Sequence, residues 1–161
     1  RPAPHIRIFA GNAQGQTLAE AKKRCIGAIQ ECAEHAAAKG VFLGLENHGG
    51  IVAEVDDLLE IIAAVRSRWV GINLDSGNFH SDDPYADLAR CAPYAVNVQF
   101  KVEIQRSGKP KEPCALGQFV QILRAANYQG YVALEYEAAP DPWQVVPGIL
   151  RQMSEALQNA R

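Results

Sequence analysis

The alternation of apolar and polar residues divides the chain into one repeated unit: a short apolar run, a loop and an amphipathic helix. The apolar runs predict strands at residues 5–10, 41–47, 70–75, 95–104 and 131–137. The amphipathic stretches predict helices near residues 17–38, 54–67, 82–91, 115–126 and 142–158. Thr17, followed three residues later by Glu20, predicts a capping box at the first helix. Strands joined by crossovers of this length pair in parallel, so the pattern predicts parallel βαβ units.

The two faces of the expected strands differ, and this difference separates two parallel architectures. One face is aliphatic and the other becomes polar toward the C-terminal end, as where Val98 and Phe100 alternate with Gln99 and Lys101. An open sheet covered by helices on both sides needs strands that are apolar on both faces. The alternation instead favours an α/β fold of TIM-barrel type, whose strands present a site at one end.

The number of strands limits how complete such a barrel can be. A full TIM barrel has eight strands and about 250 residues, whereas the pattern gives five strands in 161 residues. We therefore expect one domain over residues 1–161 that is either a partial barrel or a smaller sheet closed in another way. Five strands leave two open edges, which favours a homo-oligomer or association with a further segment.

Composition narrows the kinds of partner. The chain is 48% hydrophobic and 21% charged, with a net charge of −2 and scattered Lys and Arg, which disfavours nucleic acid and anionic membranes. No apolar run approaches the roughly 20 residues of a membrane span. The four cysteines form no CxxC pair, which indicates a reducing compartment. We expect a cytoplasmic protein, unless a leader has been removed, with a small polar partner.

Four of the expected strands end in side chains with oxygen ligands. These are Glu46, Asp75, Gln99 and Glu135, separated by 29, 24 and 36 residues, or about one βα unit each. In a barrel such residues converge above the core. Three carboxylates in one cleft repel one another unless a cation lies between them, and oxygen ligands suit a hard ion such as Mg²⁺ or Mn²⁺. The alternative is that these residues are unconnected, solvated strand ends.

Four segments carry a resemblance to a known family. GLENHGG (44–50), GINLDSGNF (71–79), NVQFKVEI (97–104) and GYVALEYEA (130–138) resemble, in order and spacing, the second half of the sugar phosphate isomerase/epimerase family. Its members are xylose isomerase-like, metal-dependent TIM barrels. The resemblance implies that the chain corresponds to strands 4 to 8 of the barrel and lacks the first three βα units.

The resemblance also implies a set of metal ligands. In this family a Glu, an Asp, a His and a second Glu usually hold one divalent metal ion, and they fall on Glu46, Asp75, Gln99 and Glu135. Gln99 stands where the family usually has histidine, which makes the site harder and less suited to zinc. The resemblance thus favours Mn²⁺ or Mg²⁺, with Co²⁺ or Zn²⁺ as the other choices.

The activity that the resemblance implies is isomerisation or epimerisation of a sugar or sugar phosphate. The reaction is proton transfer next to a carbonyl, through an enediolate that a divalent ion stabilises as a Lewis acid. Glu46 and Glu135 are the expected base and acid on the two faces of this planar intermediate. Return of the proton on one face would give isomerisation instead of epimerisation.

Four further residues are candidates for contacts with the substrate. Lys101 shares a strand face with Gln99, and it either binds substrate or neutralises a nearby glutamate. His48 either orients the substrate or packs the HGG turn. Asn78 stands where the family often has a histidine, and His80 lies two residues further on. The polar segment 105–114 is expected as a mobile loop over the substrate or as plain surface.

Other functions stay open at this point. Relatives on the same scaffold include polyol dehydratases, and an incomplete barrel could also be a non-catalytic binding module. Endonucleases of the family need a histidine-rich zinc cluster and a basic face, and the sequence offers neither.

Overall fold

The computed structural model describes residues 4–158 and contains one parallel sheet with helices along it. The sheet order is β1-β2-β3-β4-β7, and every neighbouring pair in it is parallel. The strands of this sheet are β1 (His5–Ile8), β2 (Phe42–Glu46), β3 (Val70–Asp75), β4 (Ala95–Phe100) and β7 (Val132–Leu134). The α-helices are α1 (Leu18–Lys39), α2 (Val55–Val65), α3 (Pro84–Cys91), α4 (Leu116–Ala125) and α5 (Pro142–Gln158). Short 3₁₀ helices cover Gly50–Val52 and Ala92–Tyr94.

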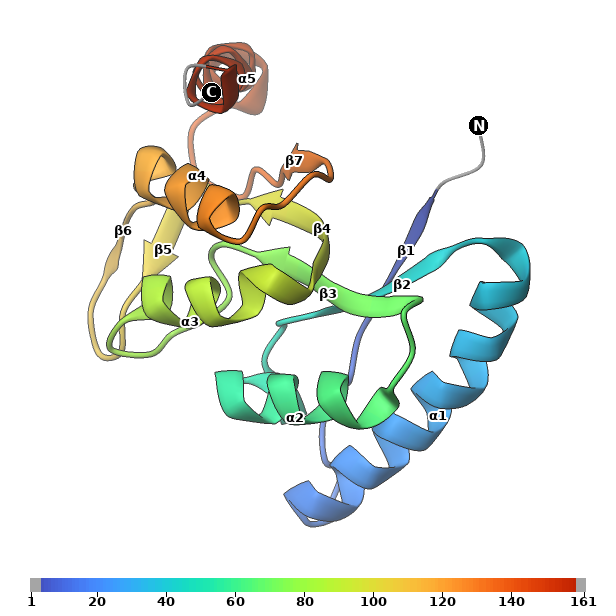
Figure 1. Ribbon diagram of the computed structural model, residues 1–161. Helices are drawn as coiled ribbons and strands as arrows, with labels where there is room; N and C mark the ends of the chain where they lie inside the picture. Colours follow the sequence, from blue (N-terminus) through green and yellow to red (C-terminus); the bar gives the residue numbers. More distant parts are fainter. Residues whose placement is uncertain (1–3, 159–161) are drawn as a thin grey trace.

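The sheet is curved and has the shape of a half-barrel. Figure 1 shows α1, α2, α3 and α4 along one side of the sheet, with α5 beyond α4. The opposite side of the sheet is free of helices in the described part of the chain. The expected partial barrel of TIM type is therefore confirmed. Among residues 4–158, no helix is both long enough and apolar enough to cross a membrane.

The aliphatic strand face forms the core against the helices. Leu45, Ile72, Leu74 and Val98, one or two from each central strand, are completely buried. They belong to one core cluster with apolar residues of the helices, among them Leu58 and Ile61 of α2, Leu88 of α3 and Phe119 of α4. Burial of these side chains leaves the polar strand faces on the open side of the half-barrel.

The first helix begins and ends where local chemistry directs. The Glu20 amide donates to Thr17 Oγ1 (3.3 Å), and the Thr17 amide donates to Glu20 Oε2 (2.9 Å), so the predicted capping box is present. Gly40 ends the helix in the left-handed region (φ 66°), where glycine has no steric penalty. The helix therefore returns the chain directly into β2.

The fourth strand is shorter than its alternation predicts. β4 ends at Phe100, and a second strand, β5 (Glu103–Gln105), pairs antiparallel with β6 (Lys111–Pro113). The expected strand over 95–104 is thus two strands, and the expected loop over 105–114 is one arm of a hairpin. Ser76 Oγ accepts from the Lys101 amide (2.8 Å), so a side chain replaces the next sheet hydrogen bond.

Candidate functional site

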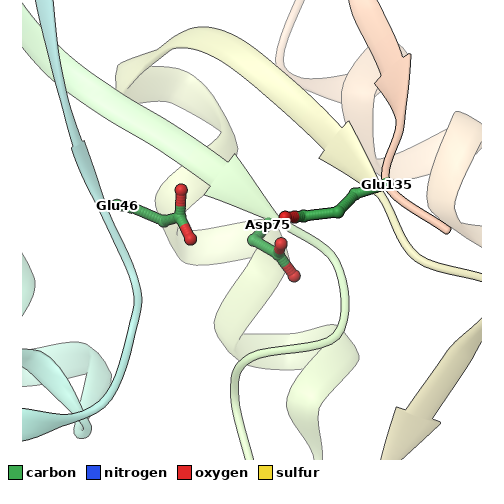
Figure 2. Close-up of side chains that lie close together, drawn as sticks. All are labelled: Glu46, Asp75 and Glu135. Carbon is green, nitrogen blue, oxygen red and sulfur yellow. The ribbon is translucent and has the colours of Figure 1, made fainter. Parts of the chain in front are cut away.

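Three carboxylates meet at the C-terminal ends of the strands. Glu46 ends β2, Asp75 ends β3, and Glu135 follows β7 directly. One oxygen atom from each lies within 4.8 Å of the others. Figure 2 shows Glu46 and Glu135 approaching from opposite sides, with Asp75 between them. The structure thus brings together all three carboxylates that the sequence singles out.

Gln99, the fourth expected ligand, lies beside this cluster and is also buried. Its Nε2 donates to Glu135 Oε2 over 2.6 Å, and its Oε1 accepts from Asn73 Nδ2. The side chain therefore presents its NH₂ group to the carboxylates. Its carbonyl oxygen faces Asn73, so Gln99 needs a turn of its amide plane to act as an oxygen ligand.

Asp75 is held through its backbone. Asn47 Nδ2 donates to the Asp75 carbonyl (2.9 Å), and Asn47 Oδ1 accepts from the Asp75 amide (2.8 Å). One carboxylate oxygen of Asp75 accepts from the Gly77 amide (2.8 Å). The other oxygen, Oδ2, is buried and has no hydrogen-bond partner among the described residues. An orphaned carboxylate oxygen aimed into an acidic cluster is the arrangement that a bound cation satisfies.

Two cationic side chains flank the carboxylates. Arg7 Nη1 lies 3.2 Å from Glu46 Oε2 and 3.6 Å from Glu135 Oε1. Lys101 Nζ lies 3.6 Å from Asp75 Oδ2 and 3.9 Å from Glu135 Oε2. The cluster therefore brings three carboxyl groups together with two cationic side chains.

Lys101 makes its shortest contact outside the cluster. Its Nζ lies 2.8 Å from Glu137 Oε2 and donates to Asn78 Oδ1 over 3.0 Å. Asn78 Nδ2 in turn donates to Glu46 Oε1 over 3.3 Å. Of the two roles expected for Lys101, pairing with Glu137 is realised, and the lysine also lies at the site. Glu103 instead faces Lys111 over 3.7 Å.

Burial shifts the proton affinities of these groups. Burial, reinforced by the Glu135 carboxyl, raises the pKa of Asp75 to about 8. Burial also raises the pKa of Glu46, against the opposing effect of Arg7. Burial disfavours the charge on Lys101, but the surrounding carboxylates outweigh it and raise the pKa of Lys101. The lysine stays charged, whereas Asp75 holds a proton at neutral pH unless a cation replaces it.

Two adjoining cavities open next to the carboxylates, with volumes of about 330 and 270 Å³. His48, Asn78 and His80 line both of them, and Lys101 lines the smaller one. All four residues expected to contact the substrate thus line the smaller cavity. The β5–β6 hairpin forms part of the same wall.

Three site residues were missed in the sequence. The alternation of β1 could have identified Arg7, because it lies between Ile6 and Ile8 and faces inward. Asn73 also lies on the inward face, where its Nδ2 donates to Glu46 Oε2 over 2.9 Å. Alternation does not identify Asn47, because its side chain forms hydrogen bonds with the backbone of the neighbouring strand.

Comparisons with known proteins agree with the fold. The sequence model of a family described as xylose isomerase-like TIM barrel matches residues 2–155. No curated protein sequence matches the chain.

Solved structures with the same fold are similar at low sequence identity. A xylose isomerase domain protein from Planctomyces limnophilus superposes with a TM-score of 0.74 at 19% identity, over 97% of this chain and 60% of that one. The 3-keto-D-glucoside 4-epimerase of E. coli gives 0.74 at 19%, over 92% and 63%. A xylose isomerase-like TIM barrel protein from Mycobacterium smegmatis, in complex with magnesium, gives 0.65 at 24%, over 84% and 51%. The chain thus spans less than two thirds of the length of each.

Proposed function

The chain belongs to the xylose isomerase-like TIM barrel family, and on that premise we propose that it is part of a metal-dependent isomerase or epimerase of sugars or sugar phosphates. The observation that carries the proposal is the meeting of Glu46, Asp75 and Glu135 within 4.8 Å, at the strand ends where barrels of this type place their chemistry.

The donor set fits a hard divalent ion. Three carboxylates and one amide are oxygen ligands of the kind that Mg²⁺ and Mn²⁺ prefer. Asp75 Oδ2, which is buried and has no hydrogen-bond partner among the described residues, supports the assignment. We assign Glu46, Asp75 and Glu135 as ligands, with Gln99 as the fourth after its amide turns. We favour Mn²⁺ or Mg²⁺ over Co²⁺ and Zn²⁺. When bound, the ion supplies Lewis-acid polarisation of a substrate carbonyl.

Glu46 and Glu135 are the groups that we assign to proton transfer. They approach the site from opposite sides, as Figure 2 shows. One carboxylate removes a carbon-bound proton next to the carbonyl, and the other returns a proton to the opposite face, which gives an epimer. If one carboxylate does both on the same face, the product is the aldose or ketose isomer.

The remaining assignments concern binding. Lys101 and Asn78 lie between Glu46 and Glu137 and offer a cation and an amide to substrate oxygens. His48 and His80 line the adjoining cavities, whose size suits a small carbohydrate rather than a polymer. These contacts orient the substrate so that its reacting carbon faces the two glutamates.

The proposal is tested by exchange of carbon-bound protons. The full-length protein is incubated in D₂O with Mn²⁺ and a panel of ketoses, aldoses and their phosphates, and deuterium uptake is followed by NMR. We expect exchange next to the carbonyl, and a loss of about 10²–10⁴-fold in Glu46→Gln and Glu135→Gln. Glu31→Gln, an exposed change on α1, is the matched control and keeps the full rate.

Two results would contradict the proposal. One is unchanged exchange in both glutamine variants, and the other is no exchange with any sugar although Mn²⁺ binds. Loss of water after the first proton transfer would identify the polyol dehydratase alternative, because the same base begins that reaction. Ligand binding without any turnover would instead identify a binding module.

The partners and location are also proposals. We infer that the five strands correspond to the last five of an eight-stranded barrel and that the open edges of β1 and β7 are sites of association. All four cysteines are free thiols, which supports a reducing, cytoplasmic location. A small carbohydrate is the proposed ligand, with neither nucleic acid nor membrane as partner.

A further inference from the structure

Arg7 has a position that the proposed chemistry does not use. It lies on the inward face of β1, where its register partner on β2 is Gly44. Gly44 has no side chain, and the His5 ring of β1 fills the space beside it. Arg7, two residues further along the same face of β1, contacts the carboxylates at the ends of the other strands. The guanidinium therefore reaches across the open side of the half-barrel.

The contacts of Arg7 join two different parts of the site. Its Nη1 lies 3.2 Å from Glu46 Oε2 and 3.6 Å from Glu135 Oε1. These two carboxylates come from β2 and from the segment after β7, which are not neighbours in the sheet. One cation thus compensates two of the three proposed metal ligands.

The same guanidinium also contacts an aromatic ring. Its Cζ lies 5.0 Å from the ring centroid of Phe9, which is within cation–π range. The Phe9 ring meets the His48 ring edge-on, with centroids 5.1 Å apart. The Arg7 side chain is 41% exposed, so it is not locked by packing. The contact with Phe9 is separate from the contacts with the two carboxylates.

We propose that Arg7 is a positioning residue that holds Glu46 and Glu135 together and competes with the divalent ion for them. A cation bound by these carboxylates shares its ligands with the guanidinium and is repelled by its charge. Arg7 therefore lowers the affinity of the site for the ion. The inference rests on the proposed metal site, although not on the identity of the sugar.

The proposal is tested by titrating Mn²⁺ into the metal-free, full-length protein at pH 8, with free Mn²⁺ followed by electron paramagnetic resonance. We expect Arg7→Met to bind Mn²⁺ about tenfold more tightly than the unchanged protein, because a partly exposed charge near two ligands is removed. Arg7→Lys keeps the charge but cannot bridge two carboxylates as a planar group, so its affinity falls between the two. Arg151→Met, which removes the same charge from α5, leaves the affinity unchanged.

A second measurement separates competition from simple support of the fold. Without metal, Arg7→Met has a lower melting temperature, because Glu46 and Glu135 lose their shared cation. Saturating Mn²⁺ then raises its melting temperature by more than it raises that of the unchanged protein. If Arg7 only supported the fold, Arg7→Met would lower both the melting temperature and the affinity for Mn²⁺.

The outcomes distinguish this inference from the proposed function. Equal or weaker Mn²⁺ binding by Arg7→Met, when the unchanged protein does bind, overturns the role of Arg7 and leaves the metal site standing. Absence of Mn²⁺ binding in both proteins overturns the metal site and the inference with it.

Discussion

Asp75 combines complete burial with a carboxylate oxygen that accepts no hydrogen bond from any described residue. Its pKa of about 8 in the folded protein lies far above the usual 3.8. Between these two values the folded state carries a proton that the unfolded chain does not. The stability that this proton maintains is complete below about pH 4 and is lost as the pH rises through about 8. A divalent ion must displace the same proton.

Proton release on metal binding follows from this difference. At pH 7 we expect binding of one Mn²⁺ to release about one proton from Asp75, and at pH 9 close to none, because Asp75 is then already ionised. Calorimetric titration in buffers of different ionisation enthalpy gives the number directly. The Glu31→Gln protein serves as control and releases the same number. Equal release at both pH values would contradict the shifted pKa of Asp75.

The sequence predicted a site residue where the alternation of a strand shows which face its side chain lies on. Glu46, Asp75 and Lys101 lie where parity and strand ends place them. Gln99 was also placed correctly, but the sequence does not show which end of its amide faces the carboxylates. Neighbours such as Asn73 decide this through hydrogen bonds between strands, and those depend on register.

Among the elements, the ends of β2 and β3 are linked by a single side chain. Asn47, which directly follows β2, makes two hydrogen bonds to the backbone of Asp75, which ends β3. This clamp fixes the relative height of two strands that each carry a proposed metal ligand. It therefore contributes both to stability and to the site.

Removal of the clamp is expected to cost more than one hydrogen bond. Asn47→Ala leaves a buried N–H and a buried C=O of Asp75 unsatisfied, so we expect a loss of about 2–4 kcal/mol in the free energy of unfolding, together with weaker Mn²⁺ binding. Asn97→Ala, on the same sheet, removes one donor to Asn73 and should cost about 1 kcal/mol. Urea unfolding measures the loss of stability in both variants. Equal losses would show that the two hydrogen bonds of Asn47 contribute no more than the single bond of Asn97.

The elements themselves were predicted well where local chemistry decides them. The five helices have nearly the predicted bounds, because caps such as Thr17 and the period of the apolar residues are local signals. The hairpin of β5 and β6 was missed, because alternation continues through Val102 while the backbone turns away. The cause is a contact distant in sequence, between Ser76 and the Lys101 amide.

At the scale of the whole molecule, the half-barrel leaves apolar surface beside its edge strands. Along β1 and α1 there is a cavity of about 610 Å³, lined by residues that include Ile6, Phe9 and Leu43. Ile6 and Phe9 are 52% and 53% exposed. Neither β1 nor β7 has a second strand neighbour in the described part of the chain. The five strands of the parallel sheet were predictable from the sequence, but what completes that sheet depends on surfaces that no local pattern reports.

These open edges predict that the 161-residue chain associates with itself. An unpaired strand beside an apolar groove favours pairing with another copy, and a charge on the edge opposes it. We expect Ile6→Lys to weaken self-association by about tenfold or more, because burial of an isoleucine side chain contributes about 1.5–3 kcal/mol. Sedimentation velocity over a range of concentrations measures this. Leu18→Lys introduces the same charge at an exposed position of α1 that does not line this cavity, and should leave association unchanged. If both variants behave alike, or if the unchanged chain stays monomeric at all concentrations, the edge of β1 is not a site of association.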